Sequence, residues 1–141
     1  MGFLKINIDF LVSNNFQVNY KLHPAEFYSW KSDYPILREM VDSEVVNIVT
    51  TNPSLKEVLS ISDIVIGISS TAIYEALDHN CRVIVLDLPS SVYFEDLIDT
   101  GVIQKLDWEY KLSSNDLDFY PKKSDLFFMP TELQVIYDII N

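Results

Sequence analysis

Apolar positions along the chain follow two rhythms, one typical of helices and one typical of strands. Apolar residues at helical spacing predict a first helix over residues 3–12, and apolar residues at every second position predict a strand over residues 16–22. Runs rich in Val and Ile predict four further strands, at residues 44–50, 63–68, 82–88 and 102–106. Because helices are predicted between these strands, the pattern favours right-handed βαβ units and one parallel sheet.

Capping residues and prolines indicate where the helices begin. Asp33 is predicted to cap a helix that has Pro35 in its first turn, and Asn52 is predicted to cap another with Pro53 at its first position. The buried stripe of the first of these helices is predicted to be Ile36, Leu37 and Met40. Asn80, which tolerates the left-handed conformation, is predicted to end a helix. Helices are also predicted over residues 71–80, 93–100 and 130–141.

The order of these elements predicts an α/β fold in a single domain of residues 1–141. Its architecture is expected to be a three-layer, Rossmann-like, doubly wound parallel sheet of about five strands. The core of the domain is expected over about residues 16–106, followed by an irregular loop at 107–125 and the C-terminal helix at 130–141. A hydrophobic content of 48% is sufficient for such a core.

Composition excludes several classes of function. A formal net charge of -11 argues against binding to nucleic acid or to anionic membrane surfaces, both of which need basic patches. Cys81 is the only cysteine and is predicted to be a small core residue, and the two histidines are far apart, so no metal site is expected. No apolar run approaches the ~18 residues of a membrane span, and no basic-then-apolar leader is present. A cytoplasmic location is therefore expected.

Three consecutive hydroxyl residues lie where a buried strand runs into a helix. Ser69, Ser70 and Thr71 would stand at a helix N-terminus, where backbone N–H groups and the helix dipole favour an anion such as phosphate. Ordinary helix capping is the alternative reading, but three hydroxyls exceed what a cap needs. Glu75 lies one helical turn after Thr71, where its carboxylate would accept hydroxyls of a ribose or remain a solvated surface group.

A second candidate residue follows the strand over residues 16–22. His23 precedes Pro24, which requires an extended backbone at His23. The functional hypothesis is that His23 hydrogen-bonds a phosphate or stabilises a leaving phosphate as an imidazolium, and the alternative is a loop histidine without a role. In doubly wound sheets ligands bind beyond the carboxyl ends of strands, so one crevice is expected to contain His23 and the 69–71 hydroxyls.

The order of these features resembles a known family pattern between Lys21 and Leu106. His23-Pro24 after one strand and Ser69-Ser70 at a later helix start resemble motifs in the C-terminal, nucleotide-binding half of GT-B glycosyltransferases. Families with this pattern include bacterial capsule polysaccharide enzymes, sialyl- and polysialyltransferases and CDP-glycerol glycerophosphotransferases. The resemblance implies transfer from a CMP- or CDP-activated donor in the synthesis of bacterial surface polysaccharide.

The resemblance also implies roles for particular residues. His23 would assist departure of the nucleotide as the catalytic residue, Ser69, Ser70 and Thr71 would bind the donor phosphate, and Glu75 would bind the donor ribose. No metal and no further cofactor is implied. Such enzymes have two Rossmann-like domains, whereas this chain contains one, so the implied partners are the activated donor and an N-terminal acceptor domain or partner subunit. The isolated domain is expected to be inactive.

Two other interpretations remain open from the sequence. One is a related sugar-nucleotide domain, such as that of a UDP-GlcNAc 2-epimerase, which shares the two-domain architecture but binds a uridine nucleotide. The other is a non-catalytic module in which the fold serves assembly with a partner.

The sequence contains neither a GxGxxG dinucleotide-binding fingerprint nor a phosphate-binding P-loop.

Overall fold

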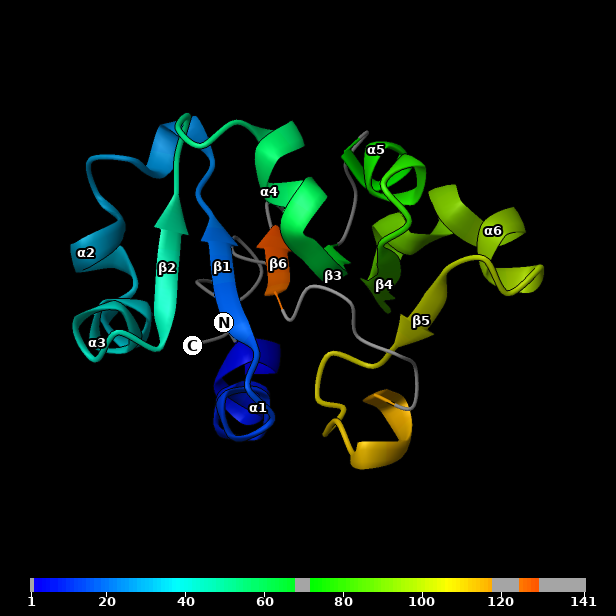
Figure 1. Ribbon diagram of the computed structural model, residues 1–141, viewed down its shortest axis with the longest axis horizontal. Helices are drawn as coiled ribbons and strands as arrows, with labels where there is room; N and C mark the ends of the chain where they lie inside the picture. The colour runs from blue at the N-terminus through cyan, green and yellow to red at the C-terminus, as the bar shows by residue number, and fades with distance from the viewer. Residues whose placement is uncertain (1, 68–71, 118–124, 130–141) are drawn as a thin grey trace.

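Six parallel strands form one sheet in the order β2-β1-β6-β3-β4-β5 (Figure 1). The structure is a computed structural model that describes residues 2–67, 72–117 and 125–129. The strands are β1 (Gln17–Lys21), β2 (Val46–Val49), β3 (Ser62–Gly67), β4 (Arg82–Leu86), β5 (Gln104–Leu106) and β6 (Asp125–Met129). The α/β fold with a doubly wound parallel sheet in one domain is confirmed, with one strand more than expected.

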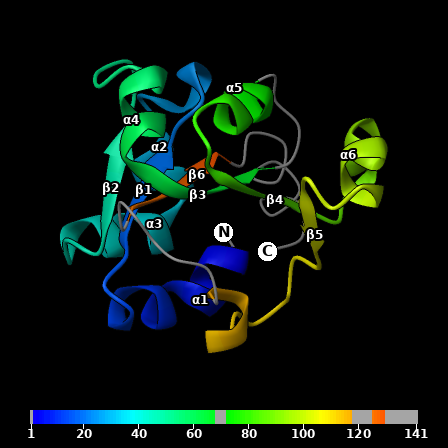
Figure 2. The ribbon, with the colours of Figure 1, turned by 45° about the vertical axis from the view of Figure 1, so that its right-hand side comes forward.

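Helices cover both faces of the sheet and give three layers (Figure 2). One face is covered by α1 (Gly2–Ser13), α2 (Trp30–Asp33) and α3 (Pro35–Asp42). The other face is covered by α4 (Leu55–Ile61), α5 (Ala72–Asp78) and α6 (Glu95–Asp99). Short 3₁₀ helices complete the described part: η1 (Pro24–Glu26), η2 (Pro89–Phe94) and η3 (Ser114–Leu117).

Two apolar cores lie between the layers because successive strand residues point to opposite faces. In β6, Phe128 packs toward the α1 face, where its ring stacks on that of Phe3 at 6.5 Å, whereas Phe127 belongs to the core on the opposite face. Every residue of β3 and β6 is buried, as expected for central parallel strands covered on both sides. Cys81 is buried, as predicted.

Several helix boundaries differ from the predictions. Asp33 lies in α2 and does not cap α3, whose N-cap residue is Tyr34. The cap of α4 is Ser54, whose Oγ accepts the Glu57 amide at 3.2 Å, and not Asn52. In α4 only Ser54 of the polar residues before the helix meets an amide of the first turn, whereas in α3 the N-cap residue Tyr34 makes no side-chain capping bond.

Two further local predictions have opposite outcomes. Ile36 does not belong to the buried stripe of α3, since it is 36% exposed, whereas Leu37 and Met40 are buried. Asn80 has a φ of 60° and ends α5 in the left-handed conformation, as predicted.

The sequence predictions do not include β6, whose first residue, Asp125, falls at the end of the predicted irregular loop. The strand follows a polar segment and holds the central position between β1 and β3. If β6 is counted first, the order of the sheet is the common doubly wound order 3-2-1-4-5-6. The described chain therefore has a circularly permuted form of that topology.

Candidate functional site

The direction of the chain crossovers reverses at the centre of the sheet. β1 connects outward to β2 across one face, while β3 connects to β4 and then β5 across the other. This switch point lies between β1 and β3, where β6 is inserted (Figure 1). Ligand crevices of doubly wound sheets form beyond the carboxyl ends of the strands at such a point.

His23 lies at this edge, two residues after the end of β1. Its backbone is extended (φ -70°, ψ 145°), as Pro24 requires, and its Nδ1 accepts the Ala25 amide at 3.1 Å. The side chain is exposed and caps η1. An Nδ1 that accepts a hydrogen bond has no proton, so the neutral ring has its proton on Nε2. In this tautomer His23 has an Nε2–H donor available to a ligand, and its role at a leaving phosphate stays a prediction.

The structure describes the helix α5 but not the three hydroxyl residues that precede it. Ser69, Ser70 and Thr71 lie outside the described residues, between the end of β3 at Gly67 and the start of α5 at Ala72. Glu75 is described, and it is exposed in the first turn of α5. The negative side chain therefore lies near the positive end of that helix, a position that suits a carboxylate with or without a ligand.

Strand register relates the two halves of the candidate site. Tyr20 in β1 and Ile66 in β3 both pair with Phe128 of β6, from opposite sides. His23 and Ser69 each follow three residues after those paired positions. At ~4.8 Å per strand spacing, the two chain segments leave the sheet about 10 Å apart. The structure thus brings β1 and β3 to the same edge, but as second neighbours and not as adjacent strands.

Few charged groups accompany His23 at this edge in the described residues. Lys21, at the end of β1, is half-buried, and Asp87, just beyond β4, is exposed. No group of three or more His, Cys, Asp or Glu that would hold a metal is present in the parts of the chain described. Any anion bound here would depend mainly on backbone N–H groups and hydroxyls.

Exposed aromatic side chains lie around the same edge. Tyr28 follows β1 and Tyr93 follows β4, and both are well exposed. Tyr74, in the first turn of α5, packs its ring against that of Phe94 at 5.7 Å, which places η2 beside α5. Tyr28, Tyr74 and Tyr93 thus all lie in segments that follow the carboxyl ends of strands.

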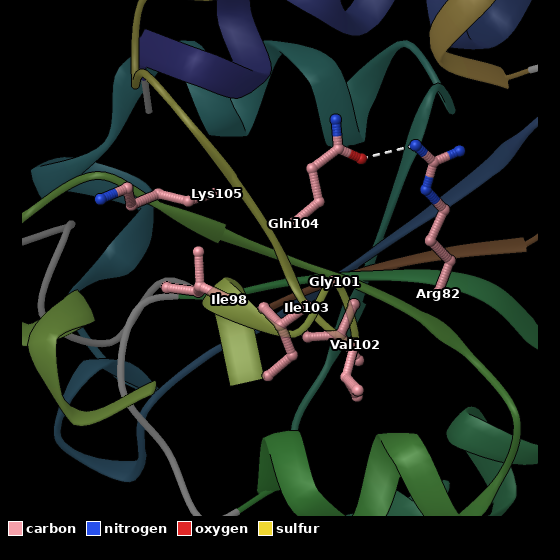
Figure 3. A pocket seen from close by; sticks show the side chains of 8 residues that line it. Arg82, Ile98, Gly101, Val102, Ile103, Gln104 and Lys105 are labelled. Carbon is pink, nitrogen blue, oxygen red and sulfur yellow. Dashed lines mark hydrogen bonds between the residues drawn. The ribbon is translucent and has the colours of Figure 1, made fainter. Parts of the chain in front are cut away.

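A separate pocket of about 530 Å³ lies near the amino-terminal ends of β4 and β5 (Figure 3). Its residues come from these strands, α6 and the turn after α6, and the side chains of Arg82 and Gln104 approach each other within it. Arg82 donates to Gln104 Oε1 at 2.5 Å and to the carbonyl of Asp116. The Arg82 guanidinium thereby links β5 to η3. We therefore interpret these bonds as structural and do not assign the pocket as a ligand site.

Sequence analysis missed a polar group within the sheet. Asn47 donates to Asn19 at 3.3 Å, and Asn19 donates to Asp125 Oδ2 at 3.1 Å. Asp125 and Asp63 are each 8% exposed. Burial is the main cause that raises the pKa of the Asp125 carboxyl, the Asn19 hydrogen bond opposes it, and the charge of Asp63 adds to it. Asn19, Asn47 and Asp63 lie within the predicted strands, and these polar residues were the available signal.

No protein-family model, curated protein or solved structure matches the chain. In the described residues, no helix is long and apolar enough to cross a membrane. The class that the structure defines is therefore an α/β domain with a doubly wound parallel sheet. Its function must be argued from the residues at the carboxyl edge.

Proposed function

We propose that this domain binds the nucleotide-activated donor of a GT-B type glycosyltransferase or glycerophosphotransferase of bacterial surface polysaccharide synthesis. The observation that carries the proposal is the position of His23. It lies beyond a strand end beside the switch point, with Nδ1 engaged as a cap and Nε2–H left as a donor. This arrangement suits a hydrogen bond to a phosphate oxygen.

The other assigned residues complete the proposed donor site. Ser69, Ser70 and Thr71 would bind the phosphate before α5, and the exposed Glu75 would accept ribose hydroxyls one turn later. Cytidine is the proposed base, as the family resemblance implies. The activated donor would be CMP- or CDP-linked, in the cytoplasm, and no cofactor is proposed.

Catalysis would need groups beyond this domain. His23 would donate to the leaving phosphate and so stabilise its developing charge. The acceptor and its general base would come from a second domain or subunit facing the same edge. Because the domain supplies only the donor side, the isolated chain is expected to bind nucleotide without transferring sugar.

Calorimetric titration with CMP, CDP, UDP and GDP tests this proposal. The expected result is preferential binding of a cytidine nucleotide, weakened about tenfold or more in His23→Asn, because a hydrogen bond to a charged group contributes ~1.5–3 kcal/mol. Asn retains an oxygen to cap the Ala25 amide, so the substitution removes the Nε2–H donor while keeping η1 capped. Ser70→Ala is expected to weaken binding in the same direction.

His79→Ala is the matched control, because His79 lies just beyond the opposite end of α5, with Nδ1 2.9 Å from the Glu75 carbonyl. The nucleotide affinity of the His79→Ala variant should equal that of the unaltered protein. Unchanged affinity in both His23→Asn and Ser70→Ala would contradict the residue assignments. Preference for UDP would favour the epimerase-like alternative.

A non-catalytic assembly module is the second candidate, and a specific observation favours it. Tyr28, Val92 and Tyr93 are each at least 60% exposed and lie beyond the carboxyl ends of strands. Val92 and Tyr93 are adjacent in η2, and neighbouring exposed apolar groups are typical of a surface that contacts another protein. Failure to bind any of the four nucleotides would favour this candidate over a donor site.

A further inference from the structure

β2 is the last strand on one side of the sheet, and β5 is the last on the other (Figure 1). The Leu22 N–H donates to the Val49 carbonyl at 3.1 Å, so the backbone groups of Val49 face β1. Because alternate residues of a strand turn these groups to opposite sides, those of Val46 and Ile48 face away from the sheet. In the described part of the chain, neither residue makes a backbone hydrogen bond to a loop or helix. An open row of donors and acceptors is a template for a further strand.

β2 lacks the features that usually protect an open strand from such pairing. Residues 45–51 contain no charged residue and no proline, and β2 contains the β-branched residues Val46, Ile48 and Val49. β5, in contrast, is three residues long and has the exposed Lys105 at its centre. Short strands and lysines both discourage pairing between sheets. The contrast between the two outer strands favours β2 as a contact surface.

A row of polar side chains runs along the sheet and ends at the open side of β2. Asn19 donates to Asp125 Oδ2 at 3.1 Å, and Asn47 donates to Asn19 Oδ1 at 3.3 Å. Asn19 and Asp125 are buried, whereas Asn47 is exposed. A side-chain amide has two N–H donors and one acceptor oxygen, and among the described residues Asn47 uses only one donor. The rest of its amide is therefore available to a partner beside β2.

We propose that a second copy of this chain pairs with β2, so that the two β2 strands lie antiparallel about a twofold axis at Asn47. Val46 and Ile48 would then exchange backbone hydrogen bonds with Ile48 and Val46 of the copy. Asn47 would lie opposite the same residue of the copy, and each amide would donate its second N–H to the oxygen of the other. This pairing is independent of which ligand the carboxyl edge binds.

Charge favours this surface for contact between two copies. With a net charge of -11 the copies repel each other, so they approach most easily where acids are absent. Glu44 is the charged residue nearest to β2 in sequence, and in the proposed register it lies opposite the uncharged Thr50 of the copy. The half-buried Val41 and Val45, next to β2 in sequence, add apolar surface. Because paired strands alone bury little area, a weak, reversible dimer is expected.

Sedimentation equilibrium of the full chain, from about 1 μM to about 1 mM at about 0.15 M salt, tests the proposal. The molar mass of the unaltered protein should rise with concentration from that of one chain toward that of two. Asn47→Lys should weaken dimerisation about tenfold or more, because it opposes two like charges and removes the amide pair. Asn115→Lys is the matched control, since it adds the same charge at an exposed asparagine of η3, beyond β5. It should dimerise as the unaltered protein does.

A cysteine at position 47 tests the register. Residues that face each other at a position without backbone hydrogen bonds have Cα atoms about 4.5 Å apart, within the range of a disulfide. Asn47→Cys should therefore form a covalent dimer rapidly under mild oxidation, whereas Asn115→Cys should not. The native Cys81 is buried. This experiment also decides the question should Asn47→Lys fail to fold.

Three results would overturn the proposal. They are equal dimerisation of the unaltered protein and Asn47→Lys, equal weakening in both lysine variants, and a single-chain mass at every concentration. The last result would make an extended segment of another protein the occupant of the open strand.

Discussion

At the scale of single residues, Asn7 shows how one buried polar side chain fixes a long connection. It is 1% exposed, and its Nδ2 donates to the carbonyls of Phe3 and Tyr110, both at 2.9 Å. Its Oδ1 accepts the Leu112 amide at 2.8 Å. These bonds attach α1 to the chain that leads from β5 toward η3 (Figure 2).

Asn7→Ala is therefore expected to destabilise the protein by about 1–3 kcal/mol for each backbone group left buried and unpaired. The Leu112 N–H is the buried group concerned, whereas the Tyr110 carbonyl is part-buried and contributes less. Asn14→Ala is the matched control, because Asn14 is exposed and makes one local bond, to the Phe10 carbonyl. Its effect should stay within about 0.5 kcal/mol. Urea unfolding compares the two, and equal midpoints would contradict this account of Asn7.

Sequence reasoning at this scale was reliable where a residue acts through its own backbone. Pro24 determined the extended conformation of His23, and Asn80 adopted the left-handed conformation at the end of α5. It was unreliable where partners come from elsewhere, as with the Nδ1 cap of His23, which requires the position of the Ala25 amide. The roles of Ser69, Ser70 and Thr71 stay predictions, since these residues lie outside the described part.

At the scale of elements, strands buried on both faces were predicted well. β3 contains an apolar run at residues 64–66 and β4 one at residues 83–86, and such runs are typical of a parallel sheet. β6 has the same character, but it is only five residues long and follows a polar segment. Its partners are distant in sequence, as the separation of 106 residues between Asn19 and Asp125 shows. Periodicity contains no information on such pairing, so the central strand was missed.

The position of β6 predicts tolerance of circular permutation. Phe3 at the start of α1 stacks on Phe128 near the end of β6, so a chain running from β6 into α1 would follow the common doubly wound path. A variant that begins at residue 118, continues through residue 141 and a flexible Gly-Ser linker, and ends at residue 117 is expected to keep the fold. Circular dichroism and cooperative thermal unfolding provide the measurement. Loss of cooperative unfolding would contradict the equivalence of the two topologies.

At the scale of the whole molecule, the two ends of the parallel strands differ in the residues that they present. The amino-terminal edge contains the pocket lined by Arg82, whose guanidinium donates hydrogen bonds to Gln104 and to the Asp116 carbonyl. The carboxyl edge contains His23, Glu75 and exposed tyrosines, and it lies at the switch point. The doubly wound class followed from the alternation of elements, and this class predicted which edge to examine.

The most direct test of the account is a CMP titration followed by two-dimensional amide NMR spectra of the full chain. The account predicts shift changes concentrated at residues 22–26 and 72–75, on both sides of β6 at the carboxyl edge. Residues 98–105 around the amino-terminal pocket should keep their positions. Changes confined to that pocket, or no changes at saturating nucleotide, would contradict the claim that this edge is a donor site.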